Sequence, residues 1–155
     1  PRVSCLHRRT PYLVVGSLTT FTVFETLPNG GISQLKSTFT NNPADFVTAN
    51  ELVQLLQTEN TNYLFAFYSE NFPNRRIQKL HISETGTLSQ AGLIILTNPT
   101  DQSPGSYGYL HHRPGDNYLY SFVTGNLNLN FIDTTQLTSQ KLVQMPAGYT
   151  GFTHF

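Results

Sequence analysis

Alternating apolar and polar residues, interrupted by turn sequences, run along most of this chain. The alternation is clearest in NYLFAFYSE, where Tyr63, Phe65 and Phe67 would lie on one face of a strand and the residues between them on the other. This pattern predicts a mainly β chain. Similar runs predict further strands at about residues 12–27, 32–40, 75–83, 88–97, 107–111, 118–124 and 127–132.

Turn chemistry supports these strand boundaries. Residues 28–31, Pro-Asn-Gly-Gly, suit a tight hairpin because Asn and Gly adopt positive φ at low cost, and residues 84–87 form a second predicted turn. In the strand at residues 32–40, three apolar positions are predicted to be buried: Ile32, Leu35 and Phe39.

One segment departs from the alternating pattern. In TANELVQLLQTEN, the apolar residues Leu52, Val53, Leu55 and Leu56 have the spacing of one face of an amphipathic helix. A short α-helix that ends near Gln57 is therefore predicted here.

The 155 residues are predicted to form one compact unit. Residues 1–10 would be a linker or lead-in, and residues 11–155 a single β-rich domain without an internal repeat. The expected fold class is mainly β, a compact antiparallel barrel or sandwich with one short α-helix.

Charged residues are scarce in this sequence. They make up 12% of the chain, about half of the roughly 25% typical of soluble domains, and the formal net charge is zero. Because nucleic-acid binding usually requires a basic surplus, no nucleic-acid partner is expected. No apolar run approaches the roughly 20 residues that span a bilayer, so no membrane insertion is expected. Cys5 is the sole cysteine, which excludes an internal disulfide and favours a structural role.

The best candidate for a site is the long loop at residues 98–116, which contains three Pro and three Gly. Loops of this length in compact domains often carry function. This loop mixes aromatic faces with charged donors, as surfaces that bind glycans or proteins often do. The candidate ligand-binding residues are Tyr107, Tyr109, His111, His112, Arg113 and Asp116.

Catalytic and metal sites have weaker support. Adjacent histidines on extended backbone point to opposite sides, so His111 and His112 do not readily share one metal ion. A Ser-His-Asp triad would need Ser103, Ser106 or Ser121 beside one of these imidazoles, and no Gly-x-Ser-x-Gly motif is present. No catalytic residue, metal ion or cofactor is therefore assigned, and the chain is not expected to be an enzyme.

Two adjacent arginines follow the predicted turn at residues 70–74. On strand geometry Arg75 and Arg76 would point to opposite faces, so only one of them can join a given surface. A cross-strand ion pair with Glu70 or Glu84 is predicted in preference to a contact with RNA or a carboxylate ligand.

The stretch ELVQLLQTENTNYLFAFYSENFPNRRIQKLHISETGTLSQAG resembles part of the protruding domain of calicivirus capsid proteins. That family shows a short helix, a strand, a turn followed by arginine, a strand ending in lysine, and a glycine-containing turn. Protruding domains of related small non-enveloped RNA viruses fit similarly. The matching segments here are residues 51–57, 63–68, 74–76, 79–80 and 84–88.

The resemblance implies a surface-exposed protruding domain of a non-enveloped viral capsid protein, which mediates receptor attachment and capsid surface contacts. Its partners would be other copies of the capsid protein, in an oligomer, and a host receptor or glycan. It would lie at the virion surface after assembly in the host cytoplasm. Two alternatives stay open: a non-viral carbohydrate-binding β module, which an aromatic platform on one face would indicate, and a capsid-borne hydrolase domain.

Overall fold

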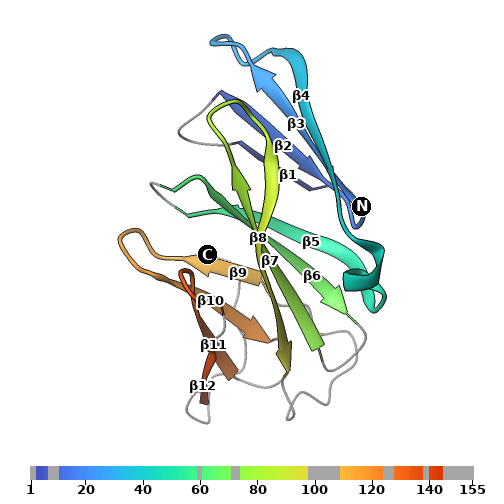
Figure 1. Cartoon of the computed structure of the whole chain (residues 1–155). Helices are drawn as coiled ribbons and strands as arrows, with labels where there is room; N and C mark the ends of the chain where they lie inside the picture. Colours follow the sequence, from blue (N-terminus) through green and yellow to red (C-terminus); the bar gives the residue numbers. More distant parts are fainter. Residues whose placement is uncertain are drawn as a thin grey trace.

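The computed structural model describes residues 3–6, 11–58, 61–70, 74–97, 109–123, 128–137 and 140–144, which form three antiparallel sheets of four strands each (Figure 1). Strands in each sheet follow one another along the chain, so each sheet is an up-and-down meander. The first sheet contains β1 (Val3–Leu6), β2 (Tyr12–Gly16), β3 (Thr20–Thr26) and β4 (Ile32–Thr40). The second contains β5 (Ala49–Gln57), β6 (Tyr63–Glu70), β7 (Asn74–Ile82) and β8 (Leu88–Thr97). The third contains β9 (Tyr109–His112), β10 (Tyr118–Val123), β11 (Asn128–Asp133) and β12 (Gln140–Gln144).

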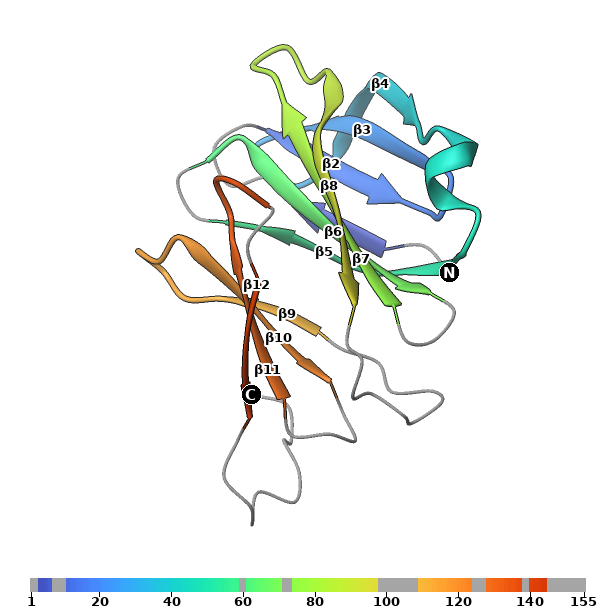
Figure 2. The same ribbon diagram turned by 60° about the horizontal axis from the view of Figure 1, so that its bottom comes forward.

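The second sheet lies between the other two, which cover its opposite faces (Figures 1 and 2). Alternation along β6 directs Leu64, Ala66 and Tyr68 into a core shared with the first sheet. The same alternation directs Phe65 and Phe67 into a separate core shared with the third sheet. The two faces predicted for this strand are therefore confirmed. The leading strands of successive sheets are neighbours, β1 beside β5 and β5 beside β9.

The prediction of a mainly β, antiparallel fold is confirmed. The sheets do not close into a barrel but stack face to face. In the part of the chain that the structure describes, the only helix is a short 3-10 helix, η1 (Pro43–Phe46), between the first and second sheets.

The predicted α-helix is wrong, because residues 49–57 form strand β5. Bulges in its pairing with β6 leave Asn50 and Val53 as extra residues. Each extra residue widens the spacing between inward-facing positions from two to three. Ala49, Leu52 and Leu55 consequently all face the core. A spacing of three lies close to the helical repeat, so this bulged strand carries the apolar pattern of a helix.

Two other predicted segments have different boundaries in the structure. The stretch predicted as one strand at residues 12–27 folds into β2 and β3, joined by a turn in which Ser17 N donates to Thr20 O at 2.8 Å. Residues 3–6 of the predicted lead-in form β1, where Cys5 packs against the core between the first and second sheets.

The structure contains a repeat that was not predicted from the sequence. The second strand of each sheet begins with a Tyr-Leu pair: Tyr12-Leu13, Tyr63-Leu64 and Tyr118-Leu119. In the first and second sheets the tyrosine faces the following sheet, and in the second and third sheets the leucine faces the preceding one. Only two adjacent positions recur, and the connections between them differ in length, so sequence inspection does not reveal the repeat.

Two of the residues predicted to be buried in β4 are exposed. Ile32 is 56% exposed and Leu35 is 57% exposed, whereas Phe39 packs against the core between the first and second sheets. Leu35 lies opposite Phe24, which lies opposite Leu13, so these three share the face that points away from the second sheet. No described sheet covers this outer face, which explains the exposure.

A buried ion pair joins β6 to β7. Arg76 pairs with Glu70, and their side chains are only 6% and 1% exposed. The guanidinium also lies 5.0 Å from the ring centroid of Phe46. The predicted cross-strand pair with Glu70 is confirmed.

Buried polar side chains also join the first and second sheets. The Tyr68 hydroxyl donates to Gln78 Oε1 at 2.7 Å, and Gln78 Nε2 donates to Asn41 Oδ1 at 2.9 Å. Asn41 Nδ2 in turn donates to Leu18 O at 2.8 Å. Burial raises the pKa of Tyr68, so the hydroxyl keeps the proton that this network requires.

Candidate functional site

Most of the candidate ligand-binding residues lie in the β9–β10 hairpin. His111 lies opposite Tyr120 in the sheet register, while His112 lies opposite a buried leucine, so the two imidazoles point to opposite faces of the third sheet. The opposite orientation predicted for the two histidines is therefore confirmed. His111 is exposed on the outer face, and Arg113 is exposed in the turn. Residues 112–117 are called the hairpin end below.

Asp116 makes most of the contacts within the hairpin end. Its amide donates to Arg113 O at 3.1 Å, and its carbonyl accepts from His112 Nε2 at 2.9 Å. Its carboxylate accepts from the amide of Tyr118 at 3.2 Å and from the hydroxyl of Tyr120. Because a carbonyl oxygen can only accept, His112 must carry its proton on Nε2.

The contact with Asp116 changes the acidity of Tyr120. The hydrogen bond that Tyr120 donates to this carboxylate raises the pKa of Tyr120, because the bond exists only with the protonated hydroxyl. Partial desolvation adds to this rise in pKa, and the nearby Arg113 opposes it. The ring of Tyr120 also meets Phe131 edge-on at 5.2 Å between centroids.

Two of the six candidate residues cannot be placed in the site. Tyr107 lies outside the described residues, and Tyr109 begins β9 with a side chain outside the described part. The other four candidates share one hairpin: His111, His112, Arg113 and Asp116.

Sequence reasoning missed the tyrosines that follow this turn. Tyr118 and Tyr120 lie on the outer face of the third sheet, because Leu119 between them faces the second sheet. The signal was present in the alternation of YLYSFV, where a leucine separates two tyrosines. Together with Phe131 they give this face an aromatic character.

Ser121 does not form the hydrolase triad considered from the sequence. Its Oγ is buried without a hydrogen-bond partner, and the Nε2 of His112 bonds to a main-chain carbonyl. Ser103 and Ser106 lie outside the described residues. Among the residues that the structure describes, no three His, Cys, Asp or Glu side chains are grouped to hold a metal ion.

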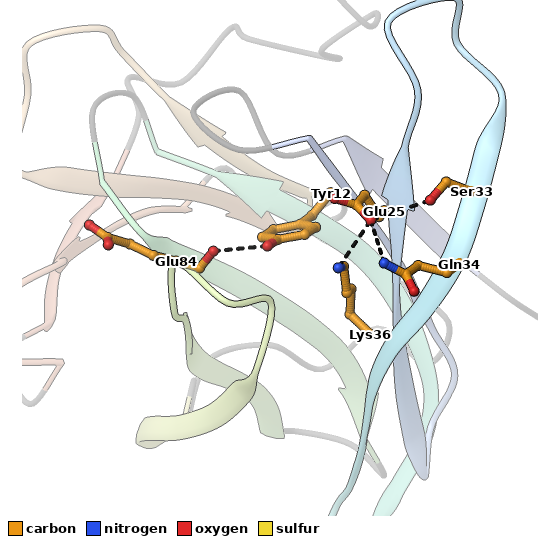
Figure 3. A network of polar contacts seen from close by, with 6 residues as sticks. All are labelled: Tyr12, Glu25, Ser33, Gln34, Lys36 and Glu84. Carbon is orange, nitrogen blue, oxygen red and sulfur yellow. Dashed lines mark hydrogen bonds and ion pairs between the residues drawn. The ribbon is translucent and has the colours of Figure 1, made fainter.

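A second polar cluster, which was not predicted, lies on the β3–β4 hairpin (Figure 3). The Glu25 carboxylate accepts from Gln34 Nε2 at 2.7 Å and from Ser33 Oγ at 3.3 Å, and it pairs with Lys36 Nζ at 3.0 Å. The bond from Gln34, followed by that from Lys36, lowers the pKa of Glu25. All these partners belong to one hairpin, so the cluster supports the hairpin and does not form a separate site.

Within the described ranges, no helix has the length and apolar character needed to cross a membrane. No protein-family model matches this sequence, and comparison with curated proteins also found no match.

Proposed function

We propose that this chain is a non-catalytic recognition domain that binds its partner through the hairpin end. The hydrogen bonds of Asp116 support this proposal most strongly, because they fix the turn from which the exposed Arg113 projects. A turn ordered before binding loses little conformational entropy when a partner binds. The guanidinium presents five N–H donors in a planar fork, which suits a carboxylate. The favoured partner is therefore an acidic glycan or a protein surface with a carboxylate.

The calicivirus resemblance suggests where such a domain would act. On a non-enveloped capsid it would lie at the virion surface, attach to a host receptor and contact other copies. Part of the resemblance is lost, since the helix expected at residues 51–57 is a strand. The capsid setting stays a prediction, and electron microscopy of the parent protein expressed alone tests it. Particles with this domain projecting from a shell are expected, and a soluble protein without assembly would contradict the capsid setting.

The aromatic outer face of the third sheet favours a second candidate function. Tyr118 is 43% exposed there, beside Tyr120 and Phe131. Aromatic rings with a polar edge are well suited to contact sugars. This arrangement is what a non-viral carbohydrate-binding β module would show.

Glycan binding by the purified chain separates the two candidates. If the hairpin end binds, Arg113→Ala should weaken binding of an acidic glycan by about tenfold or more, since charge-assisted bonds are lost. Glu84→Ala is the control, because Glu84 is exposed and lies outside the hairpin end, and it should leave binding unchanged. Loss with Tyr118→Ala but not with Arg113→Ala would support the aromatic face instead. Failure to bind any acidic or neutral glycan or protein receptor would contradict both.

A further inference from the structure

The outer faces of the first and third sheets carry the same Tyr-Leu positions as faces that are buried between the sheets. The leucines Leu64 and Leu119 of the Tyr-Leu pairs are fully buried against the preceding sheet. Leu13 occupies the same position in the first sheet but lies on its outer face, where no described sheet precedes it. At the other end, Tyr118 is 43% exposed, whereas Tyr12 in the same position is 5% exposed. The chain therefore exposes the leucine face of its first sheet and the tyrosine face of its third sheet. A tyrosine face and a leucine face are what pack together in each of its own interfaces.

Two hairpin turns of the same conformation also differ in that one is docked on a neighbouring sheet and the other is exposed. The β3–β4 and β7–β8 turns share one pattern of two main-chain hydrogen bonds, with Gly30 and Gly86 at the same position and φ of 83° and 82°. The β7–β8 turn docks on the first sheet, where Tyr12 donates to Glu84 O at 2.8 Å (Figure 3) and Ser37 Oγ donates to Gly86 O at 2.7 Å. A Cβ built on Gly86 would lie 3.0 Å from the Tyr12 ring, whereas one on Gly30 would have nothing within 4 Å. The β3–β4 turn is therefore the same docking element, but its residues 27–30 are exposed and no described sheet lies against them.

The interface between the second and third sheets uses the same arrangement. The turn after β11 docks on the second sheet, where Lys79 Nζ donates to Thr134 O at 2.6 Å. Leu137 of this turn packs where Gly92 has no side chain, since a Cβ there would lie 2.6 Å from it. Lys79 also lies 4.1 Å from the ring centroid of Tyr63, the tyrosine of its sheet's Tyr-Leu pair. In both interfaces, a turn of the following sheet therefore docks near the tyrosine of the preceding one.

The outer face of the first sheet and its β3–β4 turn carry exposed apolar side chains. On the first sheet and its turn, Leu27, Ile32 and Leu35 are 44%, 56% and 57% exposed. A pocket of about 280 Å³ opens on the same sheet, lined by Val15, Gly16, Ser17, Thr20, Thr22 and Phe24. The net charge of zero means that no overall repulsion opposes association of identical chains.

We propose that a second copy of this chain covers these faces. The outer face of the first sheet and the β3–β4 turn of one copy pack on the outer face of the third sheet of the other. With the two copies related by a half-turn, this head-to-tail contact is made twice and closes a ring with two-fold symmetry. The three sheets of each chain then form a ring of six. Six lies within the range of about four to eight four-stranded sheets found in closed β-propeller rings. This assembly does not depend on what the hairpin end binds. Because it covers the aromatic outer face of the third sheet, it excludes sugar binding at that face in the dimer.

Sedimentation velocity of the purified chain over a range of concentrations tests this assembly. The expected species has a mass of about 35 kDa, twice the 17.4 kDa of one chain. Leu35→Lys and Tyr118→Lys, each on one outer face, should weaken self-association by about tenfold or more. Val47→Lys is the matched control, because Val47 is 80% exposed and lies outside both faces. A wild-type chain that stays monomeric at all concentrations would overturn the proposal.

Mixing the two face variants tests the head-to-tail geometry. Each variant alone disrupts both contacts of the ring, but the mixture contains one contact formed by two wild-type faces. We therefore expect a mixture of Leu35→Lys and Tyr118→Lys chains to recover dimers that neither variant forms alone. Circular dichroism establishes that both variants are folded. Dimers that only one of the two substitutions disrupts, without recovery on mixing, would overturn the head-to-tail arrangement.

Discussion

At the scale of single residues, removing one partner of the buried Glu70–Arg76 pair should cost more stability than breaking an exposed pair. Glu70→Gln would leave the Arg76 guanidinium without its carboxylate, and this loss is costly because both side chains are buried. We expect the free energy of unfolding in urea to fall by about 3–5 kcal/mol. Glu25→Gln is the control. It breaks a pair with Lys36 whose two side chains are partly exposed, so it should lower the free energy of unfolding much less. Equal losses in the two variants would contradict the importance of burial.

The contact between Tyr120 and Asp116 makes a prediction about acidity. Asp116→Asn removes the charge that favours the protonated hydroxyl, so the pKa of Tyr120 should fall toward its usual value near 10. Ultraviolet titration compared with a Tyr120→Phe chain isolates this hydroxyl. An unchanged titration curve would show that Asp116 does not hold Tyr120.

Asp133 should contribute to the stability of the fold at acidic pH. Its carboxylate accepts from the amides of Gln136 at 3.0 Å and Thr135 at 2.7 Å, which lowers its pKa below 3.8. A carboxyl with a lower pKa in the folded state stabilises the fold above pH 3.8, and this contribution is lost as the pH falls through the folded-state pKa. Asp133→Asn should therefore reduce the drop in thermal midpoint below about pH 4. An unchanged pH profile would contradict this role.

At the scale of elements, β9 depends on a side chain from the second sheet. Gln54 Oε1 accepts from Leu110 N at 2.7 Å, and Gln54 Nε2 donates to Leu110 O at 2.9 Å, so the amide acts like a neighbouring strand on the edge of the third sheet. Gln54→Ala should cost about 1–3 kcal/mol and speed hydrogen exchange at Leu110. Gln34→Ala, on an exposed edge strand, is the control and should cost less than about 1 kcal/mol. Unchanged exchange at Leu110 would contradict the role of Gln54.

Strand β5 shows which elements could be predicted from sequence and which could not. Regular strands such as β6 were predictable because alternation maps directly onto two faces. Bulges at Asn50 and Val53 shift that alternation, and a bulge depends on pairing with a distant strand. The turn at residues 28–31 was predictable because its glycine chemistry is local. Backbone chemical shifts of residues 49–57 should be those of extended chain, and helical shifts would contradict the strand.

The candidate site, like the strands, was predictable from sequence only where local pattern decides the structure. Alternation correctly separated His111 from His112, because orientation along one strand is a local property. The bond from Tyr120 to Asp116 was not predictable, since it depends on how the turn folds back on β10. The wrong prediction that Leu35 is buried has a different cause. The apolar pattern of its strand is that of a covered face, but no described sheet covers that face.

At the scale of the whole molecule, three similar sheets stack. In each internal interface the tyrosine face of one sheet packs on the leucine face of the next. The turn of one sheet docks beside the tyrosine of the sheet before it in both internal interfaces. In the proposed dimer this contact recurs between copies, with the β3–β4 turn beside Tyr118 of the other chain. Pro28 occupies in that turn the position that Glu84 holds beside Tyr12.

Crosslinking between copies tests this claim most directly. In a Cys5→Ser background, chains with Pro28→Cys and chains with Tyr118→Cys are mixed and treated with a short bis-maleimide reagent. We expect rapid formation of a crosslinked dimer joined between positions 28 and 118. A mixture of Val47→Cys and Tyr118→Cys chains should crosslink only slowly, because Val47 lies outside the proposed contact. Equal rates in the two mixtures would contradict the claim that the outer faces meet head to tail.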